Sequence, residues 1–318
     1  MAITLEEAKK NVQDDLQMGV IDEFQKSNWI LEHIPFDDAV SPTGGGTTPT
    51  YSYTRLKTQP TAEFREINTE YTPSEVTKER HTVDIKVFGG SYEIDRVIAN
   101  FGGIVGEVEL QQEQKIKAAQ ALFNDTFING DVGVNTKCFD GLDKALTGSS
   151  TEYNTEKVID LSTSDLVTKN YHYFIDALDE FLGGLDGTPS FIGGNNKLIS
   201  KIRACARRAG MYQVSTDNWG RQVEHYGDIP FVDFKTKPGT NDEVVKIDGT
   251  DGTTSLYVGR LAMDGLHAVS FAGVAPVQVW LPDFSTAGAV KKGEVEMNAA
   301  IALKSSRAAG VFRKIKVK

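Results

Sequence analysis

The segment of residues 47–87 constrains the fold most, because it has the pattern of extended strand and turn yet carries almost no apolar stripe. Polar and β-branched residues alternate along it without a face that could be buried, and Pro60 and Pro73 interrupt it. A segment that buries no apolar surface of its own does not offset the entropy lost on ordering. It must therefore be held by something outside itself, and we expect this to be another copy of the chain.

Two β-prone runs, residues 50–55 and 76–87, predict that the segment is a long, ragged hairpin. Its six acidic and six basic residues balance, which favours oriented contacts with a neighbour over nonspecific adhesion. The alternative is a solvated surface loop, but an ordered loop of this length is uncommon without a function. The candidate intersubunit contacts are the charged residues Arg55, Lys57, Glu63, Arg65, Lys78 and Arg80.

One long helix is predicted directly afterwards, over residues 103–129. Its apolar residues recur on one face over about seven turns, and charged residues occupy most of the other face. We expect the apolar face to be core and the other face to be wet or shared with a neighbour. Gly130 is predicted to end the helix as a left-handed cap. The apolar residues are Ile104, Val108, Ile116, Ala119, Phe123 and Phe127.

The N-terminal region begins with a short amphipathic helix, in which Thr4 and Glu7 have capping-box spacing. An apolar cluster that includes Phe24 and Trp29 follows it. A Gly-, Thr- and Pro-rich stretch then predicts a flexible hinge centred on Gly44, Gly45 and Gly46.

The two ends of the chain carry opposite charge. Residues 1–45 contain nine acidic and three basic residues, a net charge of −6, and residues 288–318 contain eight basic and two acidic residues, a net charge of +6. We expect the two regions to meet, either within one subunit or between neighbours. Solvated charged ends are the alternative.

The second half of the chain predicts an α/β or α+β domain. Residues 149–155 have the composition of a polar linker, so we expect a boundary near residue 160. Helices are predicted near residues 166–182 and 195–209, and strands near 190–192, 228–235 and 256–262. Further strand patterns at residues 275–281, 295–305 and 310–317 indicate that the chain ends in sheet.

No pattern for catalysis, cofactor binding or metal binding stands out. The sequence has neither a phosphate-binding glycine loop nor a Gly-x-Ser-x-Gly elbow, and the five histidines show no metal-ligand spacing. The distant Cys138 and Cys205 support neither a disulfide framework nor a zinc site. A net charge of −10 disfavours a protein that coats nucleic acid, and no apolar run is long enough for a membrane span. A soluble cytoplasmic enzyme with an unrecognised site is the competing class.

Taken in order, these elements resemble the Hong Kong ninety-seven-type major capsid proteins of tailed bacteriophages, over essentially the whole chain. The resemblance is carried by the approach to the long helix at Phe101, Gly102 and Gly103, the turn at residues 139–142, residues 191–209, and residues 300–317 with Arg307. It implies an α+β fold with an N-terminal arm, an extended β-hairpin loop, a long spine helix, a peripheral domain and an axial domain.

The resemblance also implies boundaries and roles. The arm would cover residues 1–46 with Phe24 and Trp29 as anchors, and the extended loop residues 47–90. The peripheral domain would cover 91–160 with the spine helix at 103–129, the axial domain 161–274, a return to the peripheral domain 275–307, and a C-terminal strand 308–318 in the axial domain. Gly44, Gly45, Gly46, Gly89 and Gly90 would supply hinges at the loop base.

The function that the resemblance implies is a structural virion protein. Pentamers and hexamers would assemble in the host bacterial cytoplasm into an icosahedral shell around double-stranded DNA, which the inner face contacts only weakly. Since the chain starts almost at the arm, we expect a separate scaffolding protein or an already processed form, and a separate portal. Lys57 and Lys78 could serve as cross-link donors, but Asn298 does not lie at the position where the resemblance places the acceptor asparagine. We therefore expect no cross-links. An encapsulin-like bacterial compartment is the alternative within the fold.

Overall fold

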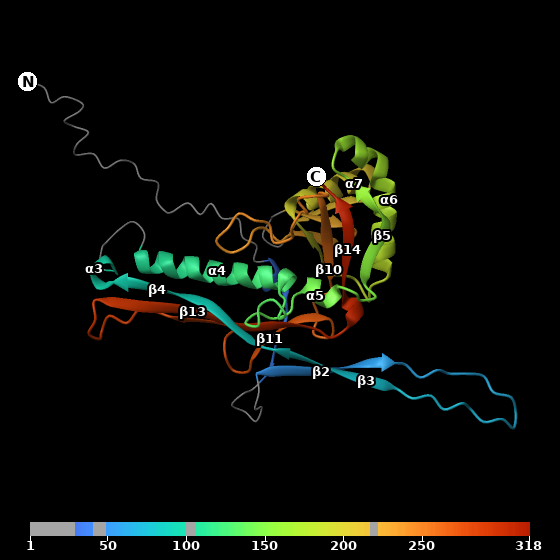
Figure 1. The fold of residues 1–318 in the computed structure, drawn as a ribbon, viewed down its shortest axis with the longest axis horizontal. Helices are drawn as coiled ribbons and strands as arrows, with labels where there is room; N and C mark the ends of the chain where they lie inside the picture. The colour runs from blue at the N-terminus through green and yellow to red at the C-terminus, as the bar shows by residue number, and fades with distance from the viewer. Residues whose placement is uncertain (1–28, 41–48, 100–105, 217–221) are drawn as a thin grey trace, which may run out of the picture.

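The computed structural model describes residues 29–40, 49–99, 106–216 and 222–318 of the chain. These residues form two sheets, a long helix that runs along one of them, and a two-stranded hairpin that projects from the body (Figure 1). Within these ranges no helix combines the length and the apolarity that crossing a membrane requires. The predicted helix after Thr4, the anchor Phe24 and the hinge at Gly44, Gly45 and Gly46 lie outside the described residues.

The first sheet has five strands and is built around β13 (Val290–Leu303). β13 pairs antiparallel with β4 (Lys86–Asp95), with β12 (Val277–Trp280) and, near its end, with β11 (Leu266–Phe271). β1 (Phe36–Val40) lies parallel to β11. The chain therefore returns to this sheet at β11. We had expected the return only after residue 274, at the end of the expected axial domain.

The long helix is α4 (Glu107–Asn129), and it lies along β4 and β13 (Figure 1). Ala119, Phe123 and Phe127 are buried, whereas Val108 and Ile116 are only partly buried. Among the described residues, the apolar face is thus core in the second half of the helix, where Phe123, Phe127 and Ile128 join the main buried cluster. The short α3 (Arg96–Ala99) follows β4 at the outer end of the sheet.

Gly130 ends α4 but not as a left-handed cap, so that prediction is wrong. Its backbone angles are φ −59° and ψ 132°, an extended conformation that any residue adopts. A Cβ at this position would lie 2.2 Å from the carbonyl oxygen of Phe139. A glycine is required here because the backbone at Phe139 packs directly against the end of α4.

The second sheet has seven strands in the order β5-β14-β10-β6-β9-β8-β7. Its central strands β14 (Ala309–Lys316), β10 (Thr253–Gly259) and β6 (Phe191–Gly194) are antiparallel to their neighbours in this group. β9 (Ile229–Asp233) runs parallel to β6. The outer strands on that side are β8 (Gln222–Tyr226) and β7 (Tyr212–Thr216).

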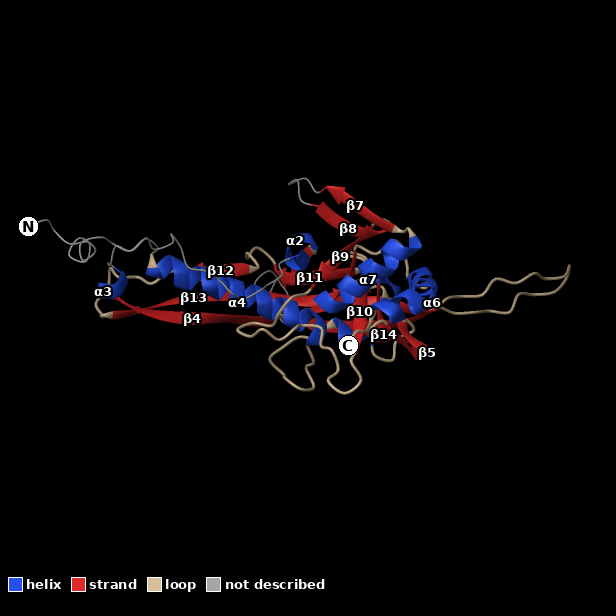
Figure 2. Ribbon diagram, turned by 90° about the horizontal axis from the view of Figure 1, so that it is seen from above, coloured by secondary structure: helices blue, strands red, loops and turns tan. Residues whose placement is uncertain are grey.

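The two predicted helices are confirmed as α6 (Ser164–Gly183) and α7 (Asn196–Ala209), and they cover this sheet (Figure 2). The side chain of Thr163 accepts a hydrogen bond from the Leu166 amide (3.3 Å), and that of Asn195 accepts one from the Leu198 amide (2.8 Å). These side chains satisfy amides in the first turn of each helix, which fixes where the helices begin.

The predicted polar linker at residues 149–155 is wrong from Glu152 onward. β5 (Glu152–Asp160) pairs in parallel with β14 and forms one edge of the second sheet. Arg313 on β14 binds Glu152 directly and Asp143 at 2.8 Å, so the polar strand is held by charged groups. The second sheet therefore begins before the expected boundary near residue 160.

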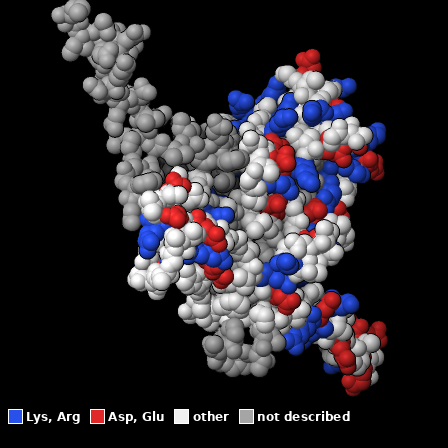
Figure 3. Space-filling view, turned by 60° about the vertical axis from the view of Figure 1, so that its left-hand side comes forward, with Lys and Arg blue, Asp and Glu red and all other residues white. Residues whose placement is uncertain are grey.

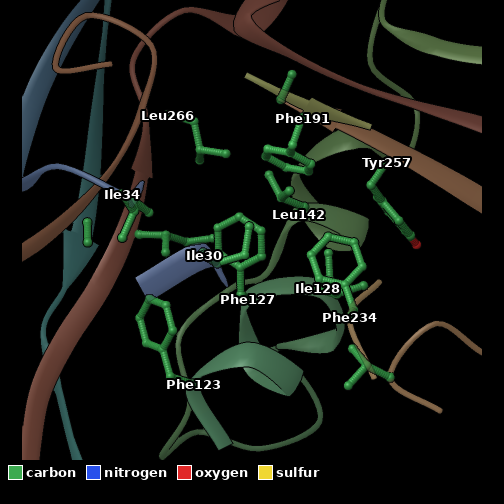
Figure 4. Packing of buried hydrophobic residues seen from close by; sticks show 14 of the residues in the cluster. Ile30, Ile34, Phe123, Phe127, Ile128, Leu142, Phe191, Phe234, Tyr257 and Leu266 are labelled. Atoms are coloured by element: carbon green, nitrogen blue, oxygen red, sulfur yellow. The ribbon is translucent and has the colours of Figure 1, made fainter. Parts of the chain in front are cut away.

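A buried apolar cluster joins the two sheets (Figure 4). Phe127 of α4 lies between Phe191 of β6 and Phe234 just after β9, with ring centroids 6.4 Å apart in both pairs. α2 (Trp29–His33) and α5 (Leu142–Leu146) contribute to the same cluster. The short 3-10 turn η1 (Ser306–Ala308) links β13 to β14, and thus the two sheets. This shared core fixes the end of α4 relative to the second sheet.

Candidate assembly site

The hairpin predicted at residues 47–87 is confirmed. β2 (Thr50–Thr58) and β3 (Thr77–Asp84) are antiparallel, with Thr50 opposite Asp84 and Thr58 opposite Thr77. Residues 59–76 between them form no strand and lie beyond the rest of the body in two perpendicular views (Figures 1 and 2). We call β2 and β3 the shaft and residues 59–76 the tip.

The base of the shaft is anchored to its own subunit, contrary to the expectation that the whole segment lacks a buried face. Tyr51 is 8% exposed, and its hydroxyl donates a hydrogen bond to Asp37 Oδ2 on β1 (2.7 Å). The hydroxyl of Tyr53 donates to the Leu303 carbonyl at the end of β13 (2.8 Å). Sequence reasoning missed this face because only alternate residues at the start of β2 contribute to it.

Arg55 extends the same anchor. Its Nε donates to the Lys304 carbonyl (2.8 Å), Nη2 donates to the Leu303 carbonyl, and its guanidinium lies 5.4 Å from the Tyr53 ring centre. These contacts are within one subunit, so Arg55 is a residue of the hairpin base, and its contact with a neighbour stays a prediction.

Lys304 and Asp37 bring together the two oppositely charged ends of the chain within one subunit. Lys304 Nζ lies 3.7 Å from Asp37 Oδ2 and 5.5 Å from the Tyr51 ring centre. This pair is the described part of the contact predicted between residues 1–45 and 288–318. It connects β1, the end of β13 and the hairpin base.

His267 of β11 is buried at the same junction. Its side chain is fully buried, with Nε2 3.9 Å from Asp37 Oδ2 and its ring 5.7 Å from the Tyr51 ring. Burial, with a smaller effect of the Lys304 charge, lowers the pKa of His267 below 6.5, although Asp37 opposes the shift. The hairpin base therefore rests on a histidine that is neutral near pH 7.

Beyond the base, every residue from 56 to 80 is exposed. The exposed residues include large apolar side chains: Phe64 is 106% exposed, Ile67 89% and Leu56 67%. Isolated exposed apolar residues are ordinary, but here they gather on a projecting element that has no core. The tip thus presents apolar surface that the described part of its own subunit leaves uncovered.

Charge is segregated along the hairpin, although residues 47–87 as a whole are neutral. The described shaft carries the cations Arg55, Lys57, Lys78 and Arg80 against Glu79 and Asp84; the tip carries Glu63, Glu66, Glu70 and Glu75 against Arg65. Figure 3 shows blue side chains along this projection and red ones around its end. The shaft is net positive and the tip net negative.

Local hydrogen bonds give the tip its shape. Glu63 Oε1 accepts from the Thr72 amide (2.7 Å), and Arg65 donates to the Thr69 carbonyl (3.2 Å) while lying 5.3 Å from the Tyr71 ring centre. The chain turns at Asn68, whose φ of 71° lies in the left-handed region that asparagine tolerates.

The other predicted contact residues remain exposed on the shaft. Lys57 and Lys78 point from opposite strands, and Arg80 Nη2 donates to Ser52 Oγ across the shaft (3.0 Å). Asn298, considered as a cross-link acceptor, is 7% exposed and pairs with Val87 inside the first sheet. It therefore lies within the subunit and away from the tip.

The glycine hinge expected at Gly89 and Gly90 is corrected. Both lie inside β4, opposite Glu296 and Val295 in a ladder of ten paired positions. A Cβ on Gly89 would lie 2.0 Å from the Val295 carbonyl oxygen, so this glycine permits close strand approach.

The predicted arm anchor Trp29 packs on the core of its own subunit, with its ring 5.8 Å from that of Phe191 and 4.1 Å from that of His33.

One serine–histidine contact was not singled out from the sequence. Ser215 Oγ and His225 Nε2 lie 2.6 Å apart on the β7–β8 hairpin, beside a cavity of about 730 Å³. His225 Nδ1 is buried without a hydrogen-bond partner among the described residues, so nothing there orients the ring as a catalytic triad does. In the same ranges, no group of three His, Cys, Asp or Glu residues could hold a metal ion.

No protein-family model and no curated protein matches this sequence. Solved structures match it along nearly its whole length. The holo-SrpI encapsulin complex of Synechococcus elongatus PCC 7942 has a TM-score of 0.68 at 11% identity, covering 99% of this chain and 97% of that one. The capsid of Myoviridae Phage XM1 has a TM-score of 0.58 at 10% identity, covering 99% and 98%.

The chain has the Hong Kong ninety-seven-type major capsid fold. A structure of Microbacterium phage Oxtober96 is similar as well, with a TM-score of 0.59 at 15% identity and full coverage of both chains. The expected α+β fold class is confirmed. At these identities the similarity is one of fold, and in this capsid fold the hairpin, α4 and the two sheets follow one another in the order expected from the sequence.

Proposed function

We propose that this chain is a major capsid protein of a tailed bacteriophage, which assembles as pentamers and hexamers into an icosahedral shell around double-stranded DNA. The observation that carries the proposal is the hairpin. Residues 56–80 are all exposed and include Phe64 and Ile67, on a chain whose fold matches a phage capsid along nearly its whole length. Exposed apolar surface on a coreless projection is stabilised when a neighbouring copy covers it.

The proposal assigns roles along the chain. The arm covers residues 1–46, with Phe24 and Trp29 as anchors, and the extended loop residues 47–90. The first sheet with α4 is the peripheral domain, and the second sheet is the axial domain. Contacts with neighbours are made by Lys57, Glu63, Arg65, Lys78 and Arg80, while Arg55 holds the hairpin base.

The partners follow from the same role, which is structural and not enzymatic. The chain assembles with itself in a bacterial cytoplasm, with a separate scaffolding protein and a portal, and ends in the virion. Its net charge of −10 supports only weak contact between the inner face and packaged DNA.

A second candidate is the shell of an encapsulin-like bacterial compartment that encloses a protein cargo. It is favoured by the TM-score of 0.68 with the encapsulin complex, higher than the 0.58 with the Phage XM1 capsid. Both candidates share the shell and the hairpin contact, and they differ in what the shell encloses.

Electron microscopy of particles purified from cells that express the chain, with its scaffold and packaging partners where these are known, tests the proposal. We expect closed shells, and nuclease-protected DNA in particles from infected cells. Small uniform shells loaded with protein and free of DNA would select the compartment. A chain that stays monomeric by light scattering at every concentration would overturn both.

A further inference from the structure

Helix α7 is strongly basic in a chain whose net charge is −10. Its 14 residues include five Lys or Arg residues and no Asp or Glu. The buried side of the helix is apolar, with Leu198 and Ile202 packed in the core of the second sheet. The cations therefore lie on the side that faces away from that core, where α7 forms the surface beside α6 (Figure 2). They are Lys197, Lys201, Arg203, Arg207 and Arg208.

Most of this positive charge has no acidic partner. Arg203 binds Glu224 directly, and among the described residues it is the one cation of α7 that has an ion pair. Lys201 Nζ donates to the neutral carbonyl of Ser162 (2.6 Å). The three remaining cations are exposed: Lys197, Arg207 and Arg208.

The outward side of α7 offers almost no apolar surface. Its residues other than the cations are Asn196, Ser200, Ala204 and Ala209. The centre of a protein–protein interface is poor in charged residues and rich in aromatic ones, so this surface is poorly suited to another protein. Arg, Lys, Ser and Asn side chains are those that bind phosphate oxygens in nucleic acids. The composition of this surface therefore favours a phosphate backbone.

Three of the cations form one row along the helix. Lys197, Lys201 and Arg208 are separated by four and seven residues, and side chains at these spacings share one face of an α-helix. The row is about 16 Å long at the usual rise of 1.5 Å per residue. Double-stranded DNA carries about one negative charge per 1.7 Å of its axis, so about nine phosphates pass along such a length. A straight row of cations thus matches a linear polyanion.

We propose that the outward side of α7 binds the phosphate backbone of double-stranded DNA inside the shell, without sequence preference. The contact is made by four cations: Lys197, Lys201, Arg207 and Arg208. The inference rests on the proposed capsid function and names the surface that contacts the packaged DNA. It also sets the orientation of the subunit, because α7 must then face the interior. The contact of one subunit is weak, with a Kd of about 10⁻⁴ M, and its repetition over the shell holds the polymer.

Fluorescence anisotropy of a labelled duplex of about 30 base pairs, titrated with unassembled full-length subunits, tests the contact. Four phosphate contacts should lower the affinity about 150-fold between 50 and 200 mM NaCl, because each contact releases about 0.9 counterions. The variant Lys197→Gln/Arg207→Gln/Arg208→Gln should show only about a 3-fold change over this range and bind at least about tenfold more weakly at 50 mM. All three residues are exposed, so the subunit should keep its fold.

The matched control removes three exposed lysines elsewhere and so changes the net charge equally: Lys137→Gln/Lys157→Gln/Lys246→Gln. It should bind the duplex as the wild type does. Arg207→Lys/Arg208→Lys should also retain the affinity within about threefold, since the charge is kept. An equal loss in the control variant, an unchanged affinity in the α7 triple variant, or no binding by the wild type at 50 mM would overturn the α7 site.

Assembly separates this contact from one between neighbouring subunits. The α7 triple variant should form closed shells at the wild-type protein concentration, and a reconstruction should show α7 facing the interior. If only this variant fails to form shells, the basic surface binds an acidic surface of another copy, such as that of Asp176 on α6, and the DNA contact is wrong. Wild-type protein that forms no shells would instead refute the proposed capsid function, whereas a duplex titration without binding would refute the α7 contact alone.

Discussion

Replacing the hairpin tip by a short turn should abolish shell assembly without destabilising the subunit. Residues 59–76 would be exchanged for Asn-Gly, a pair suited to two-residue hairpin turns. Thr58 and Thr77 already face each other across the shaft, with their Oγ1 atoms 2.7 Å apart. The shorter hairpin therefore closes where the strands are already paired.

The expected change in stability follows from exposure and chain length. Every tip residue is exposed, so the deletion removes little buried apolar surface from the isolated subunit. Shortening the connection from 18 residues to two lowers the entropic cost of loop closure by about 2 kcal/mol. We expect the free energy of unfolding to stay the same or to rise by up to that amount, and Tm to rise by no more than about 4 °C.

The base of the hairpin provides the contrast. Tyr51→Ala removes a buried ring and its hydrogen bond to Asp37, which should cost about 3 kcal/mol. Thermal unfolding of unassembled subunits would give both changes, and light scattering with electron microscopy would follow assembly. If the tip replacement unfolds the subunit, or if it forms normal closed shells, the role assigned to the tip is wrong.

Three further predictions concern the body and its charges. Gly130→Ala should lower the free energy of unfolding by about 3 kcal/mol, because the new Cβ would lie 2.2 Å from the Phe139 carbonyl oxygen. The control is Gly183→Ala on α6, where a Cβ would have no atom within 4 Å. It should be neutral or slightly stabilising in the same calorimetric measurement. Because the pKa of His267 is lowered, the unfolded chain binds a proton below about pH 6.5 that the folded chain does not. The contribution of neutral His267 to the free energy of unfolding is therefore fully present above pH 6.5 and is lost as the pH falls through the lowered pKa. His267→Gln should flatten this part of the pH–stability curve, and an unchanged curve would contradict the argument. Assembly yield should fall as NaCl rises from about 0.1 to 1 M, since the Debye length shrinks from about 10 to 3 Å, and a flat yield would remove the charge contribution.

The elements that the sequence predicts well are those set by local patterns. The polar hairpin and the helix at residues 107–129 follow from periodicity within a single segment, and so do α6 and α7. The exposure of the tip was also predictable, because the absence of an apolar stripe is visible without any partner strand.

The features that the sequence does not predict depend on pairing across long separations. Glu152 and its neighbours look like a linker because charged groups hold β5 at a sheet edge, and only the distant Arg313 makes that environment clear. Gly130 was assigned to the wrong backbone conformation because its real constraint is the returning chain at Phe139. Gly89 looks like a hinge until its partner Glu296 on β13 is known.

A cryo-electron microscopy reconstruction of particles formed by the full chain would test the central claim most directly. We predict a closed shell in which the density of each hairpin tip, residues 59–76, lies against an adjacent subunit. A shell whose hairpin tips contact no neighbour, or a protein that forms no shell, would contradict it.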